Sequence, residues 1–233
     1  MSQKSNTDIK HNPFWNVEYS HVIILFLCFL TITLLAVTGL VKNIDIPISN
    51  YFENINRNGQ SDLLVIAITT VSDTINLIIA GFILTIIKKT RRFGMIILIS
   101  LVASTILVTY VKPLVAINQP SSTFDPNFTL PEKFSLEKDS FMPFAQNYSY
   151  PSNHLASTTA FSFIVGGLIY NRLPHFAKGF MIFFPITIGI TKLYLLQQYF
   201  SDLIGGCLLG LIISSLIVKL LNIESKGQNG DLK

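Results

Sequence analysis

Three short polar groups, far apart in the sequence, have residue types that suit the binding of a phosphate group. Lys112 is followed seven residues later by Gln119-Pro120, a second group reads Pro151-Ser152-Asn153-His154, and a third begins at Thr191-Lys192. Lysines neutralise negative charge, and Pro and Ser suit the start of a helix, where free backbone N–H groups bind anions. A histidine at such a site can give a proton to a leaving oxygen. These groups therefore predict an anion site that includes an acid.

The third group decides whether the site can also do covalent chemistry. It continues from Lys192 through Gln198 to Asp202. Gln198 and Asp202 are four residues apart, so on a helix they would share a face, and we expect the carboxylate to hydrogen-bond the amide of Gln198. An amide cannot act as a nucleophile. The side chain at position 198 therefore offers no nucleophile.

Long apolar runs must position these polar groups. Half of the residues are apolar, 13% are charged and the mean hydropathy is +0.51, which is far from an ordinary soluble domain. A helix that spans a membrane needs about 20 mostly apolar residues. Runs of about this length cover 21–41, 63–87, 94–112, 154–170, 179–197 and 201–221. The sequence predicts an all-α protein, an integral membrane bundle of six helices.

The positions of Lys and Arg predict the orientation of the bundle, because cytoplasmic loops hold the excess of positive charge. Eleven of these residues fall on the side of the N-terminus and six on the other side. Residues 1–20 and 222–233 are therefore expected to be cytoplasmic tails around a membrane domain at 21–221. The polar groups, with a long outer loop at 113–153, meet at the extracytoplasmic face. We expect a multi-pass protein of the cell membrane, with membrane lipids and not nucleic acid as partners.

In combination, the three groups resemble the type 2 phosphatidic acid phosphatase superfamily, integral membrane lipid phosphatases that share a core with vanadium haloperoxidases. The family pattern is Lys, six residues, Arg-Pro; then Pro-Ser-Gly-His; then Ser-Arg, five residues, His, three residues, Asp. This chain keeps all three spacings in the same order, within residues 21–221. Where the family has Arg, Gly, Ser, Arg and His, this chain has Gln119, Asn153, Thr191, Lys192 and Gln198.

The resemblance implies a role for each matching position. In the family, the third-motif His attacks phosphorus, the Asp orients it, and the second-motif His protonates the leaving group. By position, the catalytic residues would be His154 and Asp202, with Gln198 in the place of the nucleophile. The positions implied to bind phosphate are Lys112, Gln119, Ser152, Asn153 and Lys192. The resemblance implies no cofactor and no metal.

The missing nucleophile leaves three hypotheses open, so that enzyme activity is uncertain. The first is a catalytically degenerate family member that binds a lipid phosphate or acts as the membrane partner of another protein. The second is an active lipid phosphatase with a rearranged site, acting on phosphatidate-like or polyprenyl (di)phosphate lipids. The third is a transporter-like protein that uses Asp73, which falls in the middle of the run 63–87. Ionisable residues within membrane spans are often functional.

Overall fold

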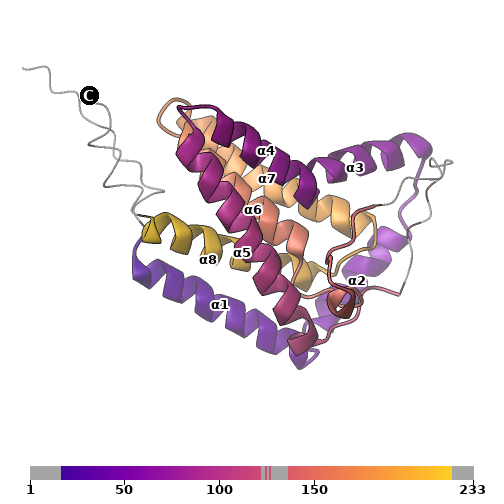
Figure 1. Ribbon diagram of the computed structural model, residues 1–233. Coiled ribbons are helices and arrows are strands. Elements are labelled where there is room, and N and C mark those ends of the chain that lie inside the picture. Colours follow the sequence, from indigo (N-terminus) through magenta and orange to yellow (C-terminus); the bar gives the residue numbers. More distant parts are fainter. Residues whose placement is uncertain (1–16, 122–123, 125, 127–135, 222–233) are drawn as a thin grey trace, which may run out of the picture.

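The computed structural model describes residues 17–121, 124, 126 and 136–221, and this part of the chain forms a bundle of helices (Figure 1). In the described residues, the β-structure consists of an isolated bridge between Asn118 and Tyr148. The all-α prediction is confirmed. Most of the expected N-terminal tail, the whole C-terminal tail and part of the loop 113–153 lie outside the described residues.

The helices follow one another along the described chain with short connections, apart from the long loop before α6. In order, they are α1 (Tyr19–Val37), α2 (Lys42–Glu53), α3 (Gly59–Val71), α4 (Thr74–Ile86), α5 (Arg91–Val115), the single 3₁₀ turn η1 (Pro143–Ala145), α6 (Asn153–Ile169), α7 (Pro174–Tyr194) and α8 (Phe200–Leu220).

Several of these helices are long and apolar enough to cross a membrane. Among the described residues, α1, α5, α7 and α8 meet this condition alone, and α3 with α4 would make a fifth span if the bent pair counts as one. Helix α6 has 17 residues, and most of them are buried among the other helices. The structure therefore supports a multi-pass membrane protein with four or five candidate spans, while the count of six stays a prediction.

The prediction of one continuous helix over 63–87 is wrong, because the helix breaks between α3 and α4 with a bend of 47°. Asp73 is the N-cap residue of α4 and not the middle of a helix. At the end of α3, the hydroxyl of Ser72 donates to the carbonyl of Thr69 at 2.7 Å. Side chains of this type satisfy backbone groups that a continuing helix would otherwise satisfy. The dense polar sequence around Asp73 thus ends one helix and starts the next.

Helix α8 approaches the first two turns of α6 closely through two glycines. A Cβ atom on Gly206 would lie 2.4 Å from the carbonyl oxygen of Ser152, and one on Gly210 would lie 2.4 Å from that of Ala156. The two helix starts are also joined directly, because the N–H of Ser152 donates to the carbonyl of Asp202 at 3.1 Å. This packing fixes the start of α6 beside the start of α8.

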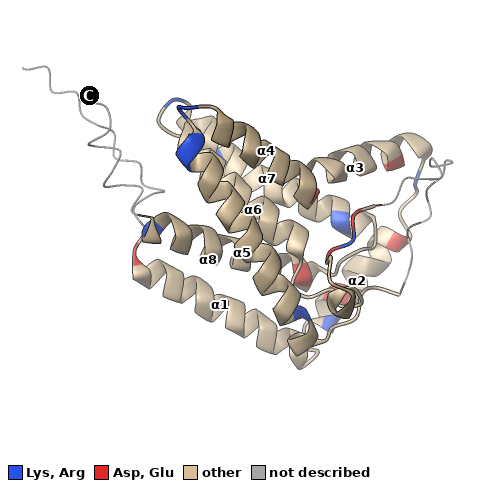
Figure 2. Ribbon diagram, viewed as in Figure 1, with Lys and Arg blue, Asp and Glu red and all other residues tan. Residues whose placement is uncertain are grey.

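The two ends of the bundle differ in charge (Figure 2). The turn between α4 and α5 contains Lys88 and Lys89, and α5 begins with Arg91 and Arg92. This basic turn lies at the opposite end of α5 from Lys112, where acidic residues of the loop before α6 gather. The polar groups singled out in the sequence therefore lie away from the basic turn.

Candidate anion-binding site

Lys112 lies in the last turn of α5 and is fully buried. Its ammonium nitrogen is 2.8 Å from Oδ2 of Asp139. It also donates hydrogen bonds to the backbone carbonyls of Tyr148 and of Ser149, the latter at 3.1 Å. A buried charge requires an opposite charge and hydrogen-bond partners of this kind. The end of α5 therefore fixes one positive charge against the loop that precedes α6.

Asp139 was not among the residues predicted from the sequence, yet it lies at the centre of the site. The N–H groups of Asn153 and His154, the first two of α6, donate to its carboxylate at 3.1 Å, and Nδ1 of His154 is 2.8 Å from Oδ1. Burial alone would raise the pKa of Asp139. The charge of Lys112 and the contact with His154 nevertheless hold that pKa below its usual range. The carboxylate is therefore held as an anion.

The start of α6 forms at the predicted position. Ser152 is the N-cap residue, and its hydroxyl accepts a hydrogen bond from the N–H of Leu155 at 3.4 Å, which confirms the capping role expected from the sequence. Asn153 stands where the family has Gly, and its N–H donates to the carboxylate of Asp139. Its side-chain amide is buried and has no hydrogen-bond partner among the described residues. The substitution therefore preserves the backbone donor.

The other nitrogen of His154 faces two further carboxylates. Nε2 lies 3.2 Å from Oε2 of Glu137 and 3.8 Å from Oδ1 of Asp73. These are ion-pair distances, and Nε2 has no hydrogen-bond partner among the described residues. The same oxygen of Glu137 accepts a hydrogen bond from the N–H of Thr74, the first residue of α4, at 2.7 Å. Helix N-termini favour carboxylates, so Glu137 and Asp139 dock onto the starts of α4 and α6 with His154 between them.

Lys192 supplies a second positive charge from the end of α7, where it is fully buried. Its ammonium donates to Oε1 of Gln197 at 3.0 Å. Its charge also acts on His154 and on the three carboxylates described above. The structure thus brings the two predicted lysines and the predicted histidine around one group of carboxylates.

Gln119 lies at the edge of this group and is exposed. Its side-chain amide donates to the carbonyl of Gln146 at 3.0 Å. Together with Glu137, Asp139 and Gln197, it lines a cavity of about 240 Å³. A neutral side chain at this position adds no charge to the site, but it forms part of the wall of a cavity that reaches Asp139.

The expected contact between Gln198 and Asp202 is wrong. Helix α8 begins at Phe200, so Gln198 lies in the loop before the helix, and the two residues do not share a helix face. The amide of Gln198 is buried and has no hydrogen-bond partner among the described residues. The carboxylate of Asp202 instead accepts a hydrogen bond from the N–H of Tyr199 at 2.7 Å. Asp202 therefore caps its own helix.

Asp73, Glu137 and His154 could also hold a metal ion, because each offers one ligand atom and these atoms lie within 4.8 Å of one another. One imidazole and two carboxylates are a ligand set that zinc accepts. The ammonium of Lys192 opposes this, since its charge acts on all three groups and a dication would add to it. The charge of Lys192 thus compensates in part the carboxylates that could hold a cation.

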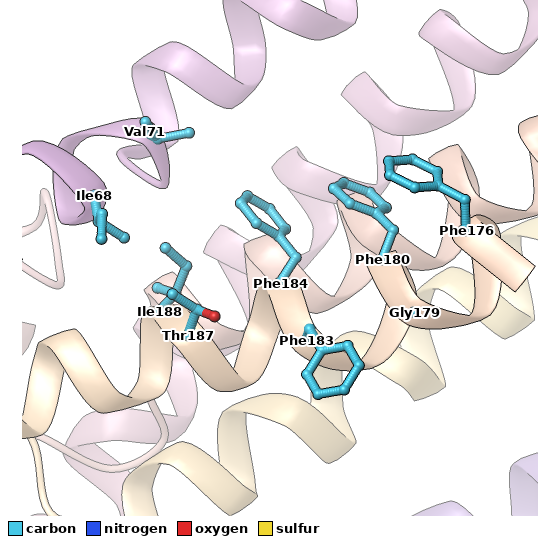
Figure 3. Close-up of a pocket in the computed structure, with 9 residues that line it drawn as sticks. All are labelled: Ile68, Val71, Phe176, Gly179, Phe180, Phe183, Phe184, Thr187 and Ile188. Carbon is cyan, nitrogen blue, oxygen red and sulfur yellow. The ribbon is translucent and has the colours of Figure 1, made fainter.

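An apolar cavity of about 450 Å³ lies between α3 and α7 (Figure 3). Ile68 and Val71 line it from α3. From α7, the rings of Phe176, Phe180 and Phe184 form a stacked row, with centroids 6.3 and 5.0 Å apart. A second apolar cavity of about 350 Å³ shares Val71 and Phe184 with the first. Both cavities adjoin the helix break next to Asp73, so an apolar chain could lie beside the charged groups.

Comparisons with known proteins support the resemblance seen in the sequence. A sequence model described as the PAP2 superfamily matches residues 93–225. The crystal structure of a protein described as the first transmembrane PAP2 type phosphatidylglycerolphosphate phosphatase from Bacillus subtilis is also similar. It has a TM-score of 0.67 and 20% identity, over 91% of this chain and 98% of that chain. No protein with a curated description matches significantly. At this identity, the structural match shows a shared fold.

Proposed function

Because the chain belongs to the PAP2 superfamily, we propose that it binds the phosphate group of a membrane lipid and lacks efficient phosphatase activity. The observation that carries this proposal is the set of donors around Asp139. The ammonium of Lys112, the ring of His154 and the first two N–H groups of α6 hold one carboxylate. Phosphate oxygens accept hydrogen bonds from the same donors, and Lys192 adds a second positive charge.

The apolar surroundings of the site support a lipid as the ligand. The cavities between α3, α4 and α7 are lined mainly by aliphatic and aromatic side chains and adjoin the break that carries Asp73. The structurally similar protein from Bacillus subtilis is described as a phosphatidylglycerolphosphate phosphatase. We therefore place a phosphatidate-like lipid or a polyprenyl phosphate at the site, with its head group at the start of α6 and its chain between the helices.

The expected lack of activity follows from Gln198. Loss of a covalent nucleophile costs on the order of 10⁶-fold in rate, or about 8 kcal/mol of barrier. Among the described residues, His21 and His175 lie in the first turns of α1 and α7, at the opposite end of the bundle (Figure 1). His154 is therefore the one described histidine at this end, and the resemblance gives it the role of the acid. The remaining lysines hold charge but do not replace an attacking group.

We place the site on the extracytoplasmic face of the cell membrane, with α6 as a sixth span and both termini inside. The excess of Lys and Arg at the other end supports this orientation. With Cys28 and Cys207 replaced by Ser, a cysteine introduced at position 138, in Lys138→Cys, should react from outside the cell with an impermeant thiol reagent. One at position 89, in Lys89→Cys, should not. The reverse pattern would overturn the orientation.

Binding by the purified full-length protein tests the proposed function. Vesicles that contain phosphatidic acid should be retained over vesicles of phosphatidylcholine, and orthovanadate should compete. Lys112→Met and Lys192→Met should each weaken vanadate binding at least tenfold. Each substitution removes a positive charge whose interaction with the anion contributes about 1.4 kcal/mol or more of binding free energy. Lys219→Met is the matched control, since Lys219 lies at the far end of α8. Equal binding by all four proteins would contradict the proposal.

An active lipid phosphatase is the second candidate, favoured by the retention of His154 and Asp202 and by the cavity that reaches the site. Phosphate release from a panel of lipid phosphates distinguishes the two. The transporter-like hypothesis stays an expectation from the sequence, with Asp73 at the break between α3 and α4 beside His154. A membrane protein partner stays an expectation from the sequence that no structural observation favours.

A further inference from the structure

We propose that Asp139 is an internal occupant of the phosphate site, and that ligand binding requires its carboxylate to leave. The inference rests on the proposed function. The donors that would hold a phosphate are already engaged by this side chain. Lys112 and Nδ1 of His154 each lie 2.8 Å from one of its oxygens, and two N–H groups of α6 donate to it at 3.1 Å.

A phosphate and the carboxylate of Asp139 cannot both use these donors. The N–H of Asn153 is directed between the two carboxylate oxygens, at 3.1 Å from each, so the side chain covers the anion position at the helix start. A phosphate at the same amides would touch Asp139, and two like charges at contact distance repel strongly where water is excluded. The carboxylate is therefore a competitor of the ligand and not a co-ligand.

Glu137 obstructs the second nitrogen of the His154 ring in the same way. The nitrogen of His154 that points away from Asp139 is Nε2, and Oε2 of Glu137 lies 3.2 Å from it. Glu137 and Asp139 are two residues apart, so one short segment covers both the anion position and the free face of the imidazole. Movement of this one segment would uncover both.

The contacts of the segment show what opposes this movement and what permits it. Asp139 is buried and held by charge, whereas Lys138 between the two acids is exposed, and its ammonium lies 3.2 Å from the amide oxygen of Gln146. Glu137 and Asp139 themselves form part of the wall of the 240 Å³ cavity. Their departure would join this cavity to the amides at the start of α6. The segment is thus held by ionic contacts next to an existing space.

Orthovanadate binding by the full-length protein in detergent tests the proposal. A site that is open for a fraction of the time binds with an affinity reduced by that fraction. Asp139→Asn keeps the shape and removes the charge, so it should bind vanadate at least tenfold more tightly than the native protein.

Asp45→Asn is the matched control for the loss of a buried acid at a helix start. The carboxylate of Asp45 accepts hydrogen bonds from the N–H and the hydroxyl of Ser201, at 2.9 and 2.6 Å, and so caps α8. This variant should bind vanadate with the native affinity. An equal gain in vanadate affinity in both variants would show a general loosening of the structure and overturn the proposal.

A second measurement detects the movement in a protein that keeps Asp139. Ser140 is buried, so Ser140→Cys, with Cys28 and Cys207 replaced by Ser, should react slowly with a charged thiol reagent. Saturating vanadate should accelerate this reaction several-fold. Vanadate binding without acceleration, or without a gain in Asp139→Asn, would overturn the internal occupant and leave the proposed function standing. Absence of binding by both the native protein and Asp139→Asn would overturn the proposed function as well.

Discussion

The starts of α6 and α8 lie side by side and are both covered by buried carboxylates, yet they are built differently. At α8, Asp45 accepts hydrogen bonds from Ser201 and Asp202 accepts one from the N–H of Tyr199, and these donors are neutral. At α6, Asp139 is held by an ammonium and an imidazole as well as by backbone N–H groups.

The difference separates a structural cap from an anion site. A carboxylate satisfies the free N–H groups of a helix start without help, as α8 shows. Two buried lysines and a histidine exceed what capping requires, and burying their charges is costly unless an anion compensates them. A cavity of about 240 Å³ also reaches the acid at α6. The buried basic side chains and the adjoining cavity, and not the cap itself, distinguish the start of α6 as a binding site.

Removal of Lys112 should have the largest effect on stability. In Lys112→Met, the buried carboxylate of Asp139 loses its ion pair, which should lower the free energy of unfolding by about 3–5 kcal/mol. The double variant Lys112→Met/Asp139→Asn should recover a large part of this loss, because no unpaired charge stays buried. Denaturant unfolding in detergent measures both. Additive losses would show that the two charges do not form a pair, and the contrast with α8 would fail.

Separation of the two helix starts should have an intermediate effect. In Gly206→Ala, the new methyl group would meet the carbonyl oxygen of Ser152 at 2.4 Å and push α8 away from α6. The resulting strain should cost about 1–3 kcal/mol of unfolding free energy. Gly179→Ala is the matched control, because a Cβ at Gly179 would make an ordinary contact of 3.8 Å with Phe183. Equal stability of both variants would show that the close approach is not needed.

Removal of a charge at α8 should have the smallest effect. Asp45→Asn replaces a charged acceptor with a neutral one at Ser201, and we expect a loss of about 1 kcal/mol in unfolding free energy. Vanadate affinity should not change. Thermal unfolding and vanadate titration of the same sample measure both quantities. A large fall in vanadate affinity would show that α8 also belongs to the binding site.

The spacing of motifs in the sequence predicted the positions of the site residues that lie at helix ends. Lys112 lies in the last turn of α5, Ser152 caps α6 and Lys192 lies in the last turn of α7. All three positions follow from apolar runs with polar residues at their limits. The position of Gln198 could not be predicted in this way. Its spacing from Asp202 has meaning only within a helix, and the helix begins after Gln198.

The acids of the site were not found because a loop has no periodicity that assigns its side chains to a face. Glu137 and Asp139 dock through tertiary contacts, and the signal that could have found them is chemical. Two buried lysines and a histidine predicted at one surface require nearby anions. For Asp73, the signal was the dense cluster of Ser, Thr and Asn around it, which is typical of helix ends and not of a membrane span.

Phosphate release tests the central claim most directly, because the account requires a site that holds a lipid phosphate without cleaving it. Purified native protein incubated with labelled phosphatidic acid should retain the lipid, release it to excess vanadate, and liberate no more inorganic phosphate than Lys112→Met does. It should also form no phosphohistidine. Gln198→His should gain at most slow turnover, because Gln119 lacks the charge of the family's Arg. Robust release by the native protein that disappears in His154→Ala would contradict the account and identify an active phosphatase.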